Sequence, residues 1–275
     1  MNLLLAFLVA MAPVDEPASI GPALVAAHNR ERAVKGLPPL VAEPRLTEAA
    51  RVHALDMAAH ANMSHEGSDD SKPADRVKKV GYLYVNTGEN VAKGQPSVAS
   101  VMTGWMNSPH HRDNILTADY TEIGVARAFD EDDVPYWCVE FGQPFPRLDP
   151  SKAEADLAHL IHKARTDADK PPLRLDPKLA AAARLIAGDL ANKDRKGKNP
   201  SFGNRMKASG YRYIMVAQSG STGAPTPESV LKAINESPDQ KRSILGDFAD
   251  LGVGYALADD GRPSWCLLFA KPFKP

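Results

Sequence analysis

Hydrophobic positions recur with the spacing of an amphipathic helix over residues 24–34 and 46–57, near the start of the chain. Further along, helical spacing alternates with short runs of β-prone residues, and Gly, Pro and Ser separate these segments. The elements expected there are a loop at 66–73, a strand at 89–94, a helix at 98–107 that stops at Ser108-Pro109, and strands at 122–129 and 135–142. This order favours an antiparallel sheet that helices cover on both faces.

The pattern returns in the second half of the chain, with identical residues in the same order. Three collinear blocks carry the match: 38–57 on 171–190 with 10 of 20 identical, 81–116 on 210–245 with 11 of 36, and 123–145 on 251–273 with 10 of 23. Such spacing is the signature of an internal repeat. The chain is therefore expected to be a tandem duplication of one small α+β domain.

The repeat sets the expected domain boundaries. They are a signal peptide or tail at 1–19, a first domain at 20–147, a linker at 148–152 and a second domain at 153–275. Residues 3–12 are apolar, too few to span a bilayer, and Ala10-Met11-Ala12 has the form of a signal-peptidase site. No Lys or Arg precedes this segment and Pro13 follows it, so an uncleaved anchor or tail is the alternative. We expect an extracellular or cell-envelope location.

Composition and charge narrow the class of protein. With 43% hydrophobic residues the chain can fill ordinary cores, and a net charge of −1 gives no global reason to expect nucleic acid as a partner. The halves differ, because residues 1–150 hold 13 basic and 20 acidic side chains and residues 151–275 hold 20 and 14. Opposite charge favours docking of the two domains on each other, with a basic surface for an anionic partner as the rival interpretation. The two cysteines, Cys138 and Cys266, occupy matching repeat positions and are expected as buried thiols.

Three polar residues of the first copy are not repeated in the second: His65, Glu89 and His111. The corresponding residues of the second copy are Lys198 (or Phe202), Gln218 and Gln240. The second copy keeps the apolar frame and the turn residues without this trio. We therefore predict that the trio serves a site in the first domain and not its fold.

Five motifs of the first copy also follow one another in a recognisable order. They are His-Asn-Arg-Glu-Arg at 28–32, Met-Ser-His at 63–65, Gly-Glu-Asn-Val-Ala at 88–92, Trp-Met-Asn-Ser-Pro-His-His-Arg-Asp-Asn-Ile-Leu at 105–116 and Tyr-Thr-Glu-Ile-Gly-Val at 120–125. Together they resemble the bacterial branch of the CAP superfamily, which comprises cysteine-rich secretory proteins, antigen 5 and pathogenesis-related class 1 proteins. The resemblance covers about residues 20–145, and the second copy shares it weakly.

The resemblance implies a three-layer α-β-α sandwich with a small, mainly antiparallel sheet, usually secreted, and a cleft lined by two histidines and two acidic residues. His65, Glu89 and His111 match three of those four positions. Ser108 stands at the fourth, so that carboxylate is missing. His110 stands where a small residue is usual, which leaves open which of the two neighbouring rings faces the cleft.

Two neutral imidazoles can hold Zn²⁺ or a similar cation, with Glu89 as a third ligand or as the group that orients a histidine. The other chemistry is general base catalysis by Glu89 on water, with a histidine as the acid. Nothing in the sequence demonstrates turnover. We favour a secreted or envelope-associated binding module for a divalent metal and a small, lipid-like or peptide ligand. The alternatives are a metal-dependent hydrolase of peptide or envelope material and an interaction protein that uses its second domain as the partner surface.

The remaining polar and aromatic residues receive simpler interpretations. His28, His53 and His60 are expected as surface or core-edge side chains. Trp105 and Trp137 are expected in the core. Glu140, which the second copy replaces with Leu268, could approach the site, but it is expected as a carboxylate on the rim of the cleft.

Overall fold

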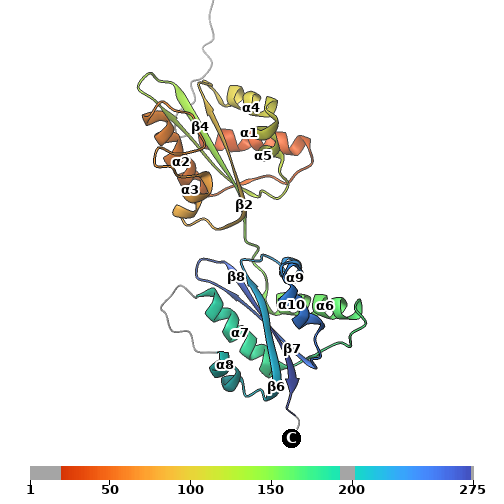
Figure 1. Ribbon diagram of the computed structural model, residues 1–275. Helices are drawn as coiled ribbons and strands as arrows, with labels where there is room; N and C mark the ends of the chain where they lie inside the picture. The colour runs from red at the N-terminus through yellow and green to blue at the C-terminus, as the bar shows by residue number, and fades with distance from the viewer. Residues whose placement is uncertain (1–19, 193–201, 274–275) are drawn as a thin grey trace, which may run out of the picture. The chain divides into compact units, whose positions relative to one another are not determined.

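The structure is a computed structural model that describes residues 20–192 and 202–273. It divides between Pro144 and Phe145 into two compact units (Figure 1). The helices of the first unit are α1 (Ile20–Val34), α2 (Pro44–Ala59), α3 (Pro73–Lys79), α4 (Val98–Asn107) and α5 (Pro109–Leu116). Its strands are β1 (Val41–Ala42), β2 (Tyr84–Lys93), β3 (Glu122–Phe129) and β4 (Pro135–Pro144).

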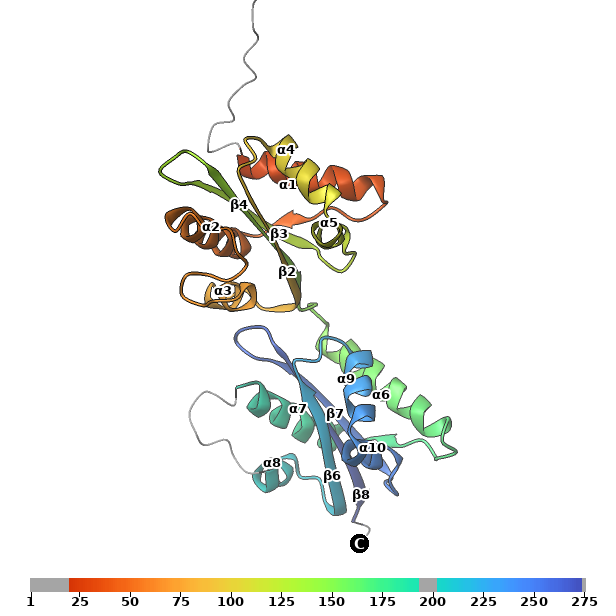
Figure 2. The same cartoon turned by 45° about the horizontal axis from the view of Figure 1, so that its top comes forward.

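The four strands form one sheet in the order β1-β3-β4-β2, so that β2 is an edge strand. Only β1 runs parallel to its neighbour; the other pairs are antiparallel. Helices α2 and α3 cover one face of the sheet, and α1, α4 and α5 cover the other (Figure 2). This is the expected three-layer α-β-α sandwich.

Strand β4 shows how the two faces are filled, because all of its residues from Pro135 to Gly142 are buried. Trp137, Val139 and Phe141 pack with residues of α1 and α4 in one core cluster. Tyr136 and Cys138 alternate with them and pack against α2 on the opposite face. A strand buried on both faces reads as a continuous apolar run, and Glu140 interrupts that run.

The second unit repeats this arrangement. Its helices are α6 (Pro150–Thr166), α7 (Pro177–Ala191), α8 (Phe202–Ser209), α9 (Pro227–Glu236) and α10 (Pro238–Leu245). Its strands are β5 (Arg174–Leu175), β6 (Tyr213–Thr222), β7 (Asp250–Leu257) and β8 (Pro263–Pro272), in the order β5-β7-β8-β6. Both copies therefore fold alike, which confirms the predicted fold class.

A buried arginine on the first helix of each copy explains part of the shared sequence. Arg32 donates to the main-chain carbonyls of Ile115, Thr117 and Tyr120, and Arg165 donates to those of Ile244 and Gly246. Both guanidinium groups satisfy carbonyls that would otherwise be buried without a donor. Arg32 thus has a structural role, although it lies in one of the motifs that carry the family resemblance.

The element boundaries differ from expectation in a few places. Helix α4 and strand β3 have the predicted bounds, whereas α3 and α5 were not predicted. Helix α6 already begins at Pro150, inside the segment expected as a linker. Lys198, the proposed counterpart of His65, lies outside the described residues. Among the helices that are described, none is long and apolar enough to cross a membrane.

Candidate functional site

The candidate site is built around Glu89, in the middle of the edge strand β2. Glu89 lies directly opposite Glu140 of β4, so the two side chains share the face that α2 and α3 cover. Only 2% of the Glu89 side chain is exposed. A buried carboxylate needs donors or an opposite charge, and the surrounding loop and helix supply both.

The two oxygens of Glu89 have different partners. Oε1 accepts a hydrogen bond from Nδ1 of His65 at 2.7 Å, and Oε2 pairs with the Arg76 guanidinium at 2.6 Å. Arg76, from α3, also donates to the main-chain carbonyls of His65 and Ser71. One guanidinium therefore fixes both the carboxylate and the loop that carries the histidine.

Beneath this pair lie three further groups that are fully buried: His53 of α2 and Cys138 and Glu140 of β4. Nε2 of His53 lies 3.8 Å from Glu89 Oε2, and the Cys138 sulfur lies 3.6 Å from the same oxygen. The interpretations of His53 as a surface or core-edge residue and of Glu140 as a rim carboxylate were wrong. Both face Glu89 from inside the domain, because their helix and strand pack on that face.

His28 also differs from expectation, since its ring is fully buried on the other face of the sheet between Trp105 and Phe141. His60 is exposed, as expected. Trp105 and Trp137 are core residues, as predicted. Both cysteines are buried free thiols, again as predicted.

Electrostatics separate the two facing carboxyl groups. Burial by itself would raise the pKa of Glu89, but the His65 hydrogen bond and the charge of Arg76 outweigh it and lower that pKa. Burial and the neighbouring Glu89 charge raise the pKa of Glu140 well above its ordinary value. Glu89 is therefore the ionised member of the pair and Glu140 the protonated one.

The pKa values of the two histidines of the predicted trio are shifted in opposite directions by their surroundings. The hydrogen bond to Glu89 raises the pKa of His65, whereas burial, with a contribution from the charge of His65, lowers the pKa of His111. His111 lies on α5, which covers the face of the sheet opposite α2 and α3. Its main-chain carbonyl accepts a hydrogen bond from the Asn90 side chain. Asn114 of the same helix donates to the Glu89 carbonyl. These bonds bring α5 against the strand edge beside the site.

The predicted trio is thus gathered around the free edge of β2 but is not a closed ligand set. Within the described part of the chain, the group of three His, Cys, Asp or Glu ligand atoms lying within 4.8 Å of one another is Glu89, Cys138 and Glu140. The His65 ring, 56% exposed, stands between this buried group and solvent. Because Nδ1 donates to Glu89, the neutral ring has its lone pair on Nε2, which is the atom available to a ligand.

The second domain replaces most of this centre with apolar or uncharged groups. Its corresponding residues are Ile186 for His53, Gln218 for Glu89, Gln240 for His111 and Leu268 for Glu140. Ile186 and Leu268 belong to a buried hydrophobic cluster, and Gln218 is exposed. Arg205, at the position of Arg76, pairs with Asp189 instead. The fold therefore does not require the polar centre.

The same comparison of copies shows what sequence reasoning missed. The repeat places Ile186 at the position of His53. This is the same loss of a polar residue in the second copy that identified the trio, so His53 could have been predicted as a site residue. Arg76 carried no such signal, because the second copy keeps an arginine there.

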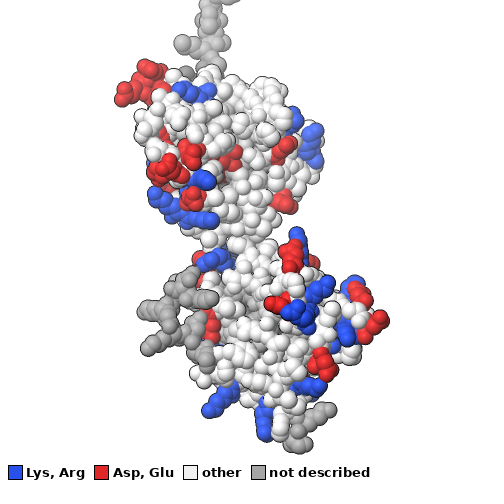
Figure 3. Space-filling model, in the orientation of Figure 1, with Lys and Arg blue, Asp and Glu red and all other residues white. Residues whose placement is uncertain are grey.

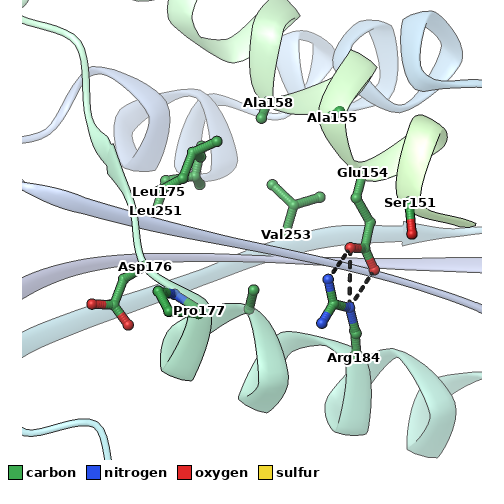
Figure 4. A pocket seen from close by; sticks show the side chains of 11 residues that line it. Ser151, Glu154, Ala155, Ala158, Leu175, Asp176, Pro177, Arg184, Leu251 and Val253 are labelled. Atoms are coloured by element: carbon green, nitrogen blue, oxygen red, sulfur yellow. Dashed lines mark hydrogen bonds and ion pairs between the residues drawn. The ribbon is translucent and has the colours of Figure 1, made fainter.

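A pocket of about 300 Å³ in the second domain lies at the other edge of the sheet, beside β7 (Figure 4). Its walls are mostly aliphatic and come from α6, α7 and the end of β5. Glu154 of α6 bonds Arg184 of α7 across it and also accepts from the Tyr255 main-chain nitrogen. This pocket has no counterpart of the His65–Glu89 pair.

The charged side chains of the described residues can be followed on one face of the molecule. Figure 3 shows acidic and basic side chains interspersed on the visible face of each unit. The charge difference between the halves is therefore not gathered into one single-sign surface on that face.

The sequence and the fold can be compared with known proteins. A sequence model of the cysteine-rich secretory protein (CAP) family matches residues 25–141 and 158–269. The uncharacterised protein YkwD of Bacillus subtilis is 40% identical over 97 residues, which are 35% of this chain and 38% of that protein. The chain thus spans less than two thirds of that relative's length.

Two solved structures are also similar. A cysteine-rich secretory protein of Staphylococcus aureus is 26% identical, with a TM-score of 0.40 over 48% of this chain and 40% of that one. Na-ASP-1 is 10% identical, with a TM-score of 0.47 over 96% of this chain and 91% of that one.

Proposed function

The chain belongs to the cysteine-rich secretory protein (CAP) family, and on that premise we propose that it is a secreted or envelope-associated binding module. Its first domain binds a divalent cation at the β2 edge, through Nε2 of His65 and the ring of His111. The family description and the apolar N-terminal segment support export from the cell. The second domain has no histidine at the described positions that correspond to His65 and His111. It therefore does not bind the ion.

The observation that carries this proposal is the hydrogen bond from His65 to Glu89. A carboxylate that accepts the Nδ1 hydrogen of a histidine fixes the tautomer and makes Nε2 a stronger ligand. Arg76 holds the other oxygen of that carboxylate, so the pair cannot rotate freely. Glu89 is thereby assigned the orienting role, and the two imidazoles are the ligands.

Two histidines form an open site, so the bound ion keeps positions for water or for a further ligand. Zinc suits such a site because imidazole is among its preferred donors and it does not demand octahedral geometry. The expected affinity is moderate, and protons compete for the same nitrogen atoms.

Calorimetric titration of the full chain with Zn²⁺ tests the proposal. His65→Ala and His111→Ala should each abolish the cleft binding. Glu89→Gln should weaken it by about 10- to 100-fold, the usual effect of losing an orienting group. His60→Ala, a change to an exposed histidine outside the site, is the matched control and should leave binding unchanged. Full binding after loss of both His65 and His111 would refute the assignment.

The same site supports a second candidate function, a metal-dependent hydrolase, because an ion held by two histidines keeps open positions at which it can bind water or polarise a substrate. Hydrolysis of peptide and cell-envelope substrates, measured with and without a chelator, separates the two. Activity that chelation removes and His65→Ala abolishes would favour the hydrolase; metal binding without activity favours the binding module.

A further inference from the structure

Glu89 and two buried side chains on its inner side, Cys138 and Glu140, form a group of possible metal ligands. We propose that Glu89, Cys138 and Glu140 form a second metal site inside the first domain, suited to Zn²⁺ or another thiophilic divalent cation. It shares Glu89 with the His65–His111 site but does not use the two histidines as ligands.

The sheet register brings the three ligands together. Glu89 and Glu140 are direct partners on β2 and β4, and Cys138 lies two residues from Glu140 on the same face. Their ligand atoms lie within 4.8 Å of one another, and the Cys138 sulfur is already 3.6 Å from Glu89 Oε2. Zinc–oxygen and zinc–sulfur bonds of about 2.0–2.3 Å place two ligands of one ion roughly 3.5 Å apart. A side-chain adjustment of about 1 Å therefore closes the set.

Glu140 is a buried acid whose oxygens receive no hydrogen bond from a donor group. Its side chain is completely buried, and neither carboxylate oxygen has a hydrogen-bond donor in the structure. An ionised carboxylate without a partner is strongly disfavoured in that position. It must carry a proton, which it can share with Glu89, or it must face a cation.

Charge balance permits the exchange of protons for a metal. In the metal-free domain a proton on each of Glu140 and Cys138 leaves both groups neutral, and both side chains are fully buried. Ionised Glu89 is then balanced by Arg76, which pairs with it. A divalent cation that displaces the two protons leaves three anionic ligands, the cation and Arg76. The buried group has no net charge in either state, which avoids the penalty of an uncompensated charge.

The donor set indicates which ion fits. Thiolate with carboxylate suits Zn²⁺ and its spectroscopic substitute Co²⁺, whereas Ca²⁺ and Mg²⁺ prefer oxygen ligands alone. His53 borders the set, with Nε2 donating to the Ser64 carbonyl and Nδ1 without a partner. The partly exposed ring of His65 bonds Glu89 from the side facing solvent.

The second domain is an internal control, because it keeps the cysteine and loses the acids. Cys266 is buried like Cys138, but Leu268 replaces Glu140 and Gln218 replaces Glu89. The thiol alone is compatible with simple packing. The first domain has Glu89 and Glu140 in addition to the thiol, and these two acids interrupt its apolar core.

Titration of the full reduced chain with Co²⁺, followed by near-ultraviolet absorption, tests the proposal. A thiolate ligand gives a charge-transfer band that histidine and carboxylate ligands do not. In the His111→Ala chain, which lacks the cleft ion, we expect the band to saturate at one Co²⁺ per chain, and in either background Cys138→Ser should remove it. Cys266→Ser, the matched change in the second copy, should retain it. Glu140→Leu, which copies the second domain and should fold, should weaken binding at least tenfold.

The outcomes separate this site from the cleft. His111→Ala should keep the band while losing the cleft ion, so failure of the proposed function leaves this test intact. No band in the wild-type chain, a band that survives Cys138→Ser, or a band that depends on Cys266 would overturn the proposal. Circular dichroism of Glu140→Leu distinguishes a lost ligand from a lost fold. A folded variant whose thiolate band forms with wild-type affinity also overturns the proposal.

Discussion

At the scale of single residues, the first domain is organised by where its ionisable groups lie relative to the sheet. Glu89, Glu140 and Arg76 are buried on one face, and His28 is buried on the other. In a low-dielectric interior each group must be paired, neutral or bound to a ligand. The chain uses pairing for Glu89 and neutrality for His28.

The His65–Glu89 pair leads to a prediction about pH. The pKa of His65 is raised, so the pair stabilises the folded state fully below the ordinary pKa of 6.5, and that stabilisation is lost as pH rises through the folded-state value. We expect the NMR titration of His65 to have a midpoint above 6.5 and that of His111 to have one below it. Glu89→Gln should move the His65 midpoint down. Identical midpoints for both rings, or no response to Glu89→Gln, would contradict the geometry.

His28 leads to a prediction of the opposite sign. Burial lowers its pKa from 6.5 to about 4, so the unfolded chain binds a proton first and stability falls as pH drops from 6.5 toward 4. The loss is about 3 kcal/mol, from 1.36 kcal/mol per unit of pKa shift.

The second copy holds Ile161, fully buried, at the corresponding position. His28→Ile should therefore fold and lose this acid sensitivity. Urea unfolding at a series of pH values compares the variant with the wild type. Equal pH dependence of the two chains would rule out His28 as the source.

At the scale of elements, helix and sheet approach one another closely at a glycine. A Cβ at Gly124 of β3 would overlap the main chain of Leu46 and Thr47 in α2. Neither element can yield without disturbing the layer that carries His53, so Gly124→Ala should destabilise the chain by about 1–3 kcal/mol.

Gly104, inside α4, has open space around its Cβ position. Gly104→Ala should instead stabilise by about 0.5–1 kcal/mol. Thermal unfolding measures both, and equal effects would show that α2 can move.

The elements also show how far sequence reasoning reaches. Helix α4 and strand β3 were predictable because their apolar spacing is regular over many residues. Ser108-Pro109 ends α4 as predicted. Pro109 also begins α5, which was not predicted, since proline is favoured in the first turn of a helix. Strand β1 has two residues and no pattern of its own; its pairing with β3 creates it.

The candidate site was predictable only in part, for a related reason. Differences between the copies identified Glu89 and His65, whose hydrogen bond the structure shows. They could not identify Arg76, whose role differs between the copies although the residue does not. Glu140 is buried because β2 and α2 pack over it. Such contacts between distant elements cannot be predicted from the local sequence pattern around Glu140.

At the scale of the whole molecule, the duplication shows which features the fold requires. Both copies keep the sheet order, the buried cysteine and the arginine of the first helix. Only the first keeps buried acids opposite one another. An apolar substitute for such a centre is often neutral or stabilising, so its retention in one copy favours a function there.

The last prediction concerns where the second domain begins. Its core clusters consist of residues of the second unit alone, so it should fold without the first. Leu148 packs against that core, and Asp149 caps α6 by accepting from the Lys152 main-chain nitrogen. A chain that begins at 152 lacks both, whereas one that begins at 145 keeps them. Loss of the cap alone costs about 0.5–2 kcal/mol. We therefore expect 145–275 to unfold at higher urea concentration than 152–275, with Asp149→Ala in the longer chain accounting for part of the difference. If the two chains are equally stable, residues 145–151 are a linker and not part of the domain.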